Sequence, residues 1–344
     1  MSSTPSASAP PAQVQALREL LSRSPRLAIT THYNPDGDAM GSALGAAHIL
    51  RVMGHAVQVV LPNTPPTFLH WMPGAGDTLA FDTAKEACER AIKEADVLLC
   101  LDFNRPDRVS GLETALRAAP VKVLIDHHRD PDGFATIAFC DPDASSTCQM
   151  VFDIFSALGQ ADTISTDAAT CLYTGLMTDT GSFRFSYTTP HTLRVAAALM
   201  ERGAVPDRIH SAIMDDNTES RLRLLGHALS EKLVVLPELR TSVITLDRSE
   251  LDRFHFKPGD TEGLVNFGLS IRGTRLAAFF VQRGDTVKIS LRSKGDLPVN
   301  EFLAAHFEGG GHRNAAGGHS KQPLQAVVDR FMAELPAFLA AHPE

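Results

Sequence analysis

Acidic and histidine side chains gather at the ends of apolar segments in the first half of this 344-residue sequence. The first such segment, RLAI, leads into THYNPDGDAMGS, in which one histidine and two aspartates lie within seven residues. Further aspartates and histidines end the runs VLLCLD and VKVLIDHH and stand in the segment GLMTDTG. The candidate residues are His32, Asp36, Asp38, Asp102, Asp126, His127, His128 and Asp179.

The residue types in this set favour divalent metal ions. Carboxylates with a minority of imidazoles and no thiolate suit hard or borderline ions in octahedral sites, and the imidazoles favour Mn²⁺, with Mg²⁺ or Co²⁺ as alternatives. About seven ligands suffice for two ions, which need a bridging carboxylate and together activate water and clamp both oxygens of an in-line displacement at phosphorus. The set therefore predicts a dimetal site for phosphoryl chemistry.

Each candidate also has a structural alternative. Pro-Asp-Gly is a turn sequence, and Asp38 suits the acidic cap of a helix over residues 39–53. Asp102 could cap a helix, and Asp179 could belong to a Thr-Asp-Thr-Gly turn. Asp126 could be the buried partner of a neighbouring histidine, because metal-bound imidazoles usually need such a carboxylate. The gathering of these residues at strand ends favours the metal site.

The order of apolar segments indicates how these residues are brought together. Short runs such as RLAITTH, AVQVVLP, VLLCLDF and VKVLIDHH alternate with helical patterns in the first half of the chain. This alternation predicts an α/β domain whose parallel sheet is covered by helices on both faces. Sites in such sheets form outside the carboxyl ends of the strands, so the candidates should meet at one edge. The later segments LVVLPELRTSVITL and TRLAAFFVQRGDTVKISLRS predict hairpin-connected strands, followed by helices, in a smaller α+β domain.

These patterns divide the chain into four expected segments. Residues 1–13 are small, polar and proline-rich, which predicts a disordered tail. Residues 14–205 form the α/β domain. Residues 206–235 are polar and helical and should connect the domains, and residues 236–344 form the α+β domain.

The composition indicates a soluble protein of a reducing compartment. The net charge of −8 repels long nucleic acid but permits a short anionic substrate in a local site. The five cysteines are odd in number and contain no C-x-x-C pair, so they indicate neither a disulfide framework nor a thiolate zinc site. An export signal is missing, and no window approaches the roughly 18 apolar residues of a membrane span. We therefore expect a cytoplasmic protein that does not bind membranes.

Several ordered segments resemble the motifs of a known family, the DHH phosphoesterases. These segments are NPDGDAMGS, the single aspartate of LDFNRPDR, DHH, and GLMTDTGSFRF. The segment GGGHRNAAGG, residues 309–318, resembles the signature of the DHHA1 domain that follows. The resemblance implies that residues 14–205 are the DHH catalytic domain and residues 236–344 the DHHA1 substrate-binding domain.

The resemblance also implies a role for each candidate. Asp102 would bridge two cations, His128 would face the scissile phosphate, and Asp126 would orient a ligand histidine from behind. The first cation would be held by His32, Asp36 and Asp102. The ligands of the second cation would be Asp38, Asp102, His127 and Asp179.

The second domain supplies candidate substrate contacts. The glycines of GGGH would let backbone N–H groups approach an anion, and a helix start after them would add its dipole. Arg292 ends a predicted strand, and its planar guanidinium suits a phosphate. By resemblance, the residues that grip a terminal phosphate or sugar are Arg292, Gly310, Gly311 and His312, with Asn300 and Asn314 as further candidates.

The implied activity is that of a phosphodiesterase of the nanoRNase kind. Such an enzyme degrades short oligoribonucleotides to mononucleotides and resembles phosphatases for 3′-phosphoadenosine 5′-phosphate. A phosphodiesterase for cyclic dinucleotides such as cyclic di-AMP, or for linear dinucleotides, is the alternative within the same chemistry. A non-catalytic nucleotide-binding module is the alternative of another class, although the intact candidate ligands argue against it. We expect short oligonucleotides or small phosphonucleotides as substrates, and a homodimer is left open.

Overall fold

The computed structural model describes residues 8–23, 25–215 and 217–343, and the chain divides into two compact units between residues 216 and 217. This division falls inside the segment 206–235 that was expected to connect the domains. Helix α8 (Pro206–Met214) belongs to the first unit and helix α9 (Glu219–Glu231) to the second. Each unit has its own sheet and its own core, so each is described by itself.

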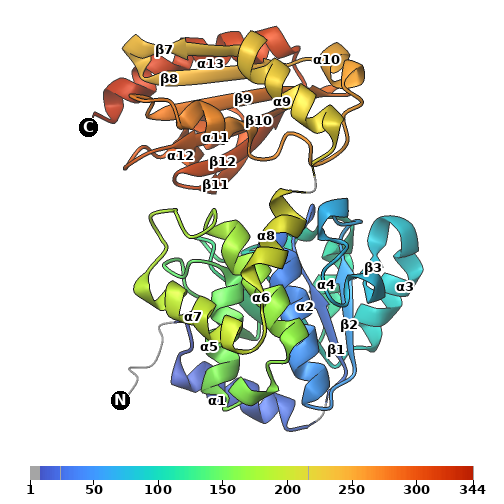
Figure 1. The fold of residues 1–344 in the computed structure, drawn as a ribbon. Coiled ribbons are helices and arrows are strands. Elements are labelled where there is room, and N and C mark those ends of the chain that lie inside the picture. The colour runs from blue at the N-terminus through green and yellow to red at the C-terminus, as the bar shows by residue number, and fades with distance from the viewer. Residues whose placement is uncertain (1–7, 24, 216, 344) are drawn as a thin grey trace. The chain divides into compact units, whose positions relative to one another are not determined.

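The first unit is built on a parallel sheet of six strands in the order β3-β2-β1-β4-β5-β6 within the described residues (Figure 1). The strand order reverses between β1 and β4, because the chain runs outward from β1 to β3 and then returns to the other side of β1. Ligands bind outside the carboxyl ends of the strands at such a reversal. The strands are β1 (Leu27–Thr30), β2 (Val57–Leu61), β3 (Leu79–Ala80), β4 (Val97–Leu101), β5 (Lys122–Asp126) and β6 (Ile137–Cys140).

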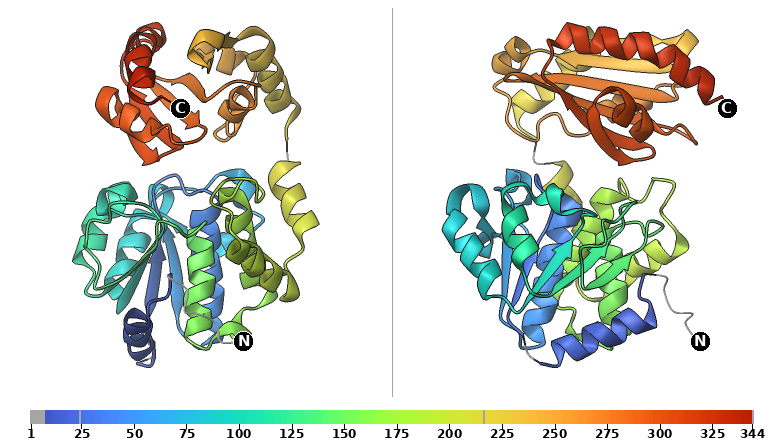
Figure 2. Two further views of the ribbon diagram at one scale, coloured as in Figure 1. Left: turned by 90° about the vertical axis from the view of Figure 1, so that its left-hand side faces the viewer. Right: turned by 180° about the vertical axis from the view of Figure 1, so that it is seen from behind.

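Helices cover both faces of this sheet, as predicted (Figure 2). Alternate residues of a strand point to opposite faces, so Leu99 and Leu101 of β4 enter one core while Leu98 and Cys100 enter the other. The first core also contains residues of α1 (Pro11–Leu21), α2 (Gly37–Val52), α5 (Thr147–Ala157), α6 (Thr166–Asp179), α7 (Pro190–Glu201) and α8. The second core contains residues of α3 (Phe81–Glu94) and α4 (Glu113–Ala118).

The prediction of a disordered tail over residues 1–13 is wrong for its last residues. Helix α1 begins at Pro11, whose missing N–H costs nothing in the first turn. The helix is anchored because Val14, Leu17 and Leu21 are buried in the first core. Residues 1–7 of the predicted tail lie outside the described residues.

Helices α2 and α6 pack closely along each other because glycines line their contact (Figure 1). A methyl group added at Gly41 would lie 2.6 Å from the backbone oxygen of Cys171. One added at Gly175 would overlap the sulfur of Cys148. This contact joins the start of α2 to the end of α6, the two places where the sequence carries Asp38 and Asp179.

The second unit contains a mixed sheet in the order β11-β12-β10-β9-β8-β7, in which β8 and β9 are parallel and the other described pairs antiparallel (Figure 1). Helices α12 (Val299–His306) and α13 (Leu324–Ala341) pack on one face. Helices α9, α10 (Arg248–Arg253) and α11 (Leu264–Leu269) pack on the other. The strands are β7 (Leu233–Leu236), β8 (Thr241–Leu246), β9 (Leu276–Arg283), β10 (Thr286–Ser293), β11 (Glu308–His312) and β12 (Ala315–Ser320).

The α+β character predicted for the second half is therefore confirmed. The five cysteines are free thiols. Within the described residues, every helix is too short or too polar to span a bilayer.

The close packing of α2 on α6 predicts a large effect of one methyl group. Gly41→Ala should lower the free energy of unfolding by about 1–3 kcal/mol, because the added carbon meets backbone atoms that cannot move aside. The matched control is Gly226→Ala in α9, where an added methyl group meets no atom within 4 Å and should be neutral or slightly stabilising. Denaturant unfolding of both variants checks this, and equal stabilities would contradict it.

Candidate metal centre

The loops after β1 and β4 place three candidate aspartates at the point where the strand order reverses. Asp36 is the residue that caps α2, since its Oδ1 accepts hydrogen bonds from the backbone N–H groups of Asp38 and Ala39. The sequence suggested Asp38 as the cap of α2. Asp38 lies instead in the first turn of this helix, and its side chain is buried. The turn thus directs two aspartates to different places.

Asp102 lies at the centre of the candidate residues. It follows β4 directly and is only 2% exposed. Its backbone has a φ of 66°, in the left-handed region that a residue other than glycine seldom adopts. Such strained residues cluster at functional sites, where the surrounding structure holds them in place.

The two oxygens of Asp102 face two different groups of ligand atoms. On one side, Oδ2 lies 3.5 Å from His32 Nε2, which in turn lies 3.9 Å from Asp36 Oδ1. On the other side, Oδ1 lies 3.6 Å from His127 Nε2. His127 Nε2 also lies 3.8 Å from Asp38 Oδ2 and 3.6 Å from Asp179 Oδ2. Asp102 is therefore the residue that both groups share.

These separations fit metal coordination. Oxygen and nitrogen ligands at roughly 2.0–2.2 Å from one octahedral ion lie about 3–4 Å from one another. In each of two groups, His32 with Asp36 and Asp102, and Asp38 with Asp102 and His127, one ligand atom per residue lies within 4.8 Å of the others. These aspartates and histidines, all buried except Asp36, can hold metal ions at this spacing.

The ligand histidines are held in the orientation that a metal ion needs. His32 Nδ1 lies 2.9 Å from the carbonyl oxygen of Tyr33, and His127 Nδ1 lies 3.2 Å from that of Ala144. A carbonyl oxygen can only accept, so each Nδ1 carries the proton and donates it. Each Nε2 then faces the carboxylates, to which it donates a hydrogen bond when the ring is protonated and beside which it would offer its lone pair to a bound cation.

The electrostatics of the cluster show how strongly its charges interact. Burial alone would lower the pKa of His32, but the hydrogen bond to Asp102 and the charges of Asp36 and Asp102 raise it to about 9. Burial raises the pKa of Asp38 well above its usual value, and the nearby charges of Asp102 and Asp179 raise it further. A pocket that crowds buried carboxylates in this way is stabilised by bound cations.

Asp126 contacts His128, not His127, the histidine expected as a ligand. Its Oδ1 lies 2.7 Å from Nδ1 of His128, the histidine expected to face the substrate. Side chains of successive strand residues diverge, which puts His128 on the side of Asp126 and turns His127 toward the aspartates. Asp126 is fully buried, and its Oδ2 has no hydrogen-bond partner among the described residues.

Thr147 and Cys148, which sequence reasoning missed, support two of the aspartates. The backbone N–H groups of Thr147 and Cys148 donate to the two oxygens of Asp38, at 2.7 and 2.9 Å. The hydroxyl of Thr147 also donates to Asp102 Oδ1, at 2.9 Å. Both residues begin α5, so Asp38 sits at a helix N-terminus that favours negative charge. The polar segment SSTC before an apolar helix is the signal that could have indicated this.

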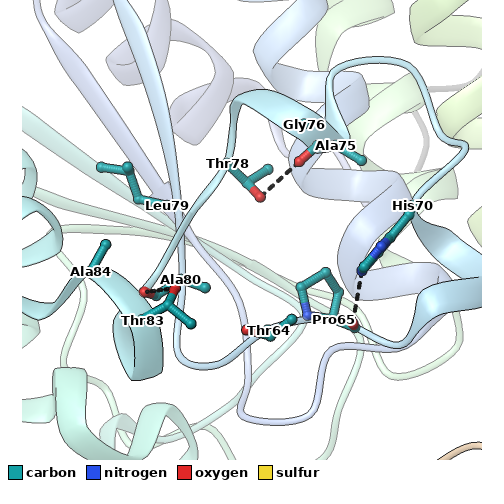
Figure 3. A pocket seen from close by; sticks show the side chains of 10 residues that line it. All are labelled: Thr64, Pro65, His70, Ala75, Gly76, Thr78, Leu79, Ala80, Thr83 and Ala84. Atoms are coloured by element: carbon teal, nitrogen blue, oxygen red, sulfur yellow. Dashed lines mark hydrogen bonds between the residues drawn. The ribbon is translucent and has the colours of Figure 1, made fainter.

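A pocket of about 420 Å³ elsewhere in the first unit contains none of the candidates (Figure 3). It is lined by uncharged groups, among them the side chains of Thr64, Thr78, Thr83 and His70. The hydroxyls of Thr78 and Thr83 donate to backbone oxygens, and His70 Nε2 bonds the carbonyl oxygen of Pro65. Without a carboxylate lining, this pocket has no metal-binding chemistry.

The segment GGGH of the second unit is a β-strand rather than a loop before a helix. β11 pairs with β12 in an antiparallel hairpin, so the predicted helix dipole is absent there. A methyl group at Gly309 or Gly311 would approach backbone oxygens of β12 to within 2.6 or 2.7 Å. One at Gly310 meets no atom within 4 Å. Gly309 and Gly311 thus serve the packing of the hairpin, whereas Gly310 leaves an open surface.

The other substrate candidates of the second unit differ in their surroundings. Ala315 of β12 is the register partner of Arg292 in β10 on one side and of His312 in β11 on the other. The three side chains therefore share one face of the sheet. The amide nitrogen of Asn314 donates to Ser293 Oγ and to the carbonyl oxygen of Gly295, bracing the hairpin turn. Asn300 lies at the start of α12, and its Oδ1 is buried without a partner among the described residues.

Comparison with known proteins gives matches over nearly the whole chain. Residues 26–176 match the DHH family, N-terminal domain, and residues 242–341 match the DHHA1 domain. The bifunctional oligoribonuclease and PAP phosphatase NrnA of Thermus thermophilus is 33% identical over 89% of this chain and 89% of its own length. The cyclic-di-AMP phosphodiesterase GdpP of Geobacillus thermodenitrificans is 28% identical over 93% of this chain, which spans 50% of that relative.

A solved structure extends the similarity to the fold. The exopolyphosphatase-related protein from Bacteroides fragilis is similar with a TM-score of 0.92 and 37% sequence identity, over 95% of this chain and 96% of that one. The motifs quoted from the sequence, the two domain matches and this likeness agree with one another. The chain belongs to the DHH family, with a DHH N-terminal domain followed by a DHHA1 domain.

Proposed function

We propose that this chain is a metal-dependent phosphodiesterase that degrades short oligoribonucleotides to mononucleotides and also dephosphorylates 3′-phosphoadenosine 5′-phosphate. One observation carries the proposal: buried Asp102 turns its two oxygens to two separate groups of aspartate and histidine ligands. A carboxylate shared in this way is what two neighbouring divalent cations require. A nucleotide-binding module without catalysis has no need for it.

The two groups define the proposed ligands. His32, Asp36 and Asp102 would hold one cation. Mn²⁺ is the proposed ion, because a set of carboxylates with imidazoles suits it, and Mg²⁺ or Co²⁺ are the alternatives. When bound, the two cations supply the positive charge that lets water attack a phosphate ester. The second cation would be held by Asp38, Asp102, His127 and Asp179.

His128 and Asp126 supply the proposed proton chemistry. The bond between His128 Nδ1 and Asp126 Oδ1 fixes the ring, so that Nε2 is the nitrogen directed to substrate. With Nδ1 held by buried Asp126, His128 is placed to exchange a proton with the leaving oxygen or to hydrogen-bond the phosphate. Neither role requires His128 to bind a cation.

The second unit supplies the proposed nucleotide contacts. Arg292 and His312 share one face of the sheet with Gly310, whose missing side chain leaves the backbone of β11 accessible. Gly311 lies beside them in β11. Asn300 has a buried oxygen without a partner among the described residues, whereas Asn314 contributes by holding the hairpin turn.

The substrate class rests on relatives and on charge. The T. thermophilus relative carries the name of an oligoribonuclease and PAP phosphatase and matches along most of both chains. The cyclic-di-AMP phosphodiesterase matches over only half of its own length, so its substrate is the second candidate. The net charge of −8 favours short substrates over long strands. A reducing compartment such as the cytoplasm would suit the free thiols.

A substrate panel tests the proposed activity directly. The purified protein with Mn²⁺ should hydrolyse a labelled dinucleotide and pentanucleotide and release phosphate from 3′-phosphoadenosine 5′-phosphate. It should act much more slowly on long RNA and on cyclic di-AMP. Initial rates at equal substrate concentration check this order, and faster cleavage of cyclic di-AMP than of the linear dinucleotide would replace the proposed substrate.

The shared carboxylate gives the second test. Asp102→Asn should reduce kcat by at least about 10³-fold, because both cations lose a charged ligand. Titration calorimetry should find two Mn²⁺ per wild-type chain and weakened binding at both sites in the variant. The exposed Asp162→Asn is the control and should keep both properties. A single ion in the wild-type protein would contradict the dimetal site.

The pair of His128 and Asp126 gives the third test. Asp126→Asn should lower kcat about 10²-fold or more, because the amide cannot replace the carboxylate that holds His128 Nδ1 and orients the ring, while the Mn²⁺ stoichiometry stays at the wild-type value. His128→Ala should have a similar effect, and the double variant should be little worse than either single variant. Independent, additive losses would show that the two side chains do not act as a pair.

A further inference from the structure

Strands β10, β12 and β11 are neighbours at one end of the second sheet (Figure 1), and their register aligns residues in rows across the strands. Strands β10, β12 and β11 lie side by side, and every second residue of each faces the side on which Arg292 lies. The register therefore gives three rows on that side. They are Arg292 with Ala315 and His312, Ser290 with Gly317 and Gly310, and Lys288 with His319 and Glu308.

The middle row is almost bare. Gly317 and Gly310 are directly opposite each other and both are exposed. Ser290 supplies the one hydroxyl of this row. A flat or flexible group can therefore lie against the backbone between the Arg292 row and the Lys288 row.

Lys288 lies near two other positive charges, those of Arg283 and Arg292. It is exposed, and no acidic side chain forms an ion pair with it among the described residues. Although part of the side chain is exposed, partial desolvation by its neighbours lowers the pKa of Lys288, and the charges of Arg283 and Arg292 lower it further, against the opposing charge of Glu262. His319, its neighbour across β12, is paired with Glu308 at 2.9 Å. An anion placed at Lys288 would relieve this repulsion.

Arg283 places a second positive charge near Lys288, and its guanidinium is held in position by Phe256 and Thr261. It ends β9, diagonally across from Lys288 in the register of β9 and β10. Its guanidinium lies 5.0 Å from the centre of the Phe256 ring, and Nη2 donates to Thr261 Oγ1 at 2.9 Å. Its Nε is buried without a hydrogen-bond partner among the described residues. A desolvated guanidinium held in this way is a permanent source of positive potential beside Lys288.

We propose that Lys288, supported by the charge of Arg283, binds a backbone phosphate of the substrate that is distinct from the group held at Arg292. The inference rests on the proposed function and deepens it. Arg292 and Lys288 are four residues apart on one strand, so their Cα atoms are about 13 Å apart. The bare glycine row between them leaves space for the sugar or base that joins two phosphates. This subsite makes affinity increase with the number of substrate phosphates.

Kinetics with substrates of different phosphate number tests the subsite. Lys288→Ala should raise KM for a 5′-phosphorylated pentanucleotide about tenfold, the loss expected for one charge-assisted contact, with kcat unchanged. KM for a dinucleoside monophosphate, which carries only the scissile phosphate, should stay at the wild-type value. The slope of log KM for the pentanucleotide against log salt should fall by about 0.7, the value for one single-strand phosphate.

Two control variants and a binding measurement complete the test. Lys321→Ala removes an exposed lysine beyond the end of β12 and should change nothing, and Lys288→Arg should restore most of the affinity. Fluorescence anisotropy of a labelled pentanucleotide, with the full chain in EDTA, separates binding from hydrolysis. Lys288-dependent binding without any cleavage would uphold the subsite and refute the proposed activity. Wild-type KM and Kd for Lys288→Ala, or equal losses for Lys321→Ala, would overturn the subsite.

Discussion

The repulsion among buried carboxylates around Asp102 is the constraint on which the first unit depends. Five aspartates and three histidines converge where the strand order reverses, and Asp102 is almost fully buried among them. Without compensation, charges of one sign in a desolvated pocket oppose folding. The histidines and the N-terminus of α5 compensate them in part, and the proposed cations would compensate them further. The charges that oppose folding are therefore the ones that would bind the metal.

Close backbone packing makes this convergence possible. Asp38 and Asp179 lie 141 residues apart in sequence (179 − 38), and they meet because glycines let helices α2 and α6 approach closely. The second unit uses glycine for a related purpose. Gly309 and Gly311 allow β11 to lie against β12, while Gly310 and Gly317 leave a bare row on the sheet. In both units, glycines therefore help to set the positions of the charged residues around them.

The sequence predicted much of the fold because period and composition are local properties. Alternating apolar runs and helical patterns indicated a parallel sheet with two covered faces, and the structure confirms both. The predictions that were wrong have different causes. The end of the tail became helix α1 because Val14 and Leu17 are buried in a core built from segments distant in the chain. The helix expected after GGGH is absent because the residues that follow it directly pair back onto it as β12.

The sequence by itself determined the chemistry of the candidate site: which acids and imidazoles end the strands, and therefore which ions they suit. Only the tertiary structure decided the geometry of that site. In the folded chain, the two oxygens of Asp102 face separate groups of ligand atoms, and Asp126 contacts His128 instead of His127. The hydroxyl of Thr147 donates a hydrogen bond to Asp102. Residue types are written in the chain, but the direction of a side chain depends on backbone angles and on packing against segments far away in sequence.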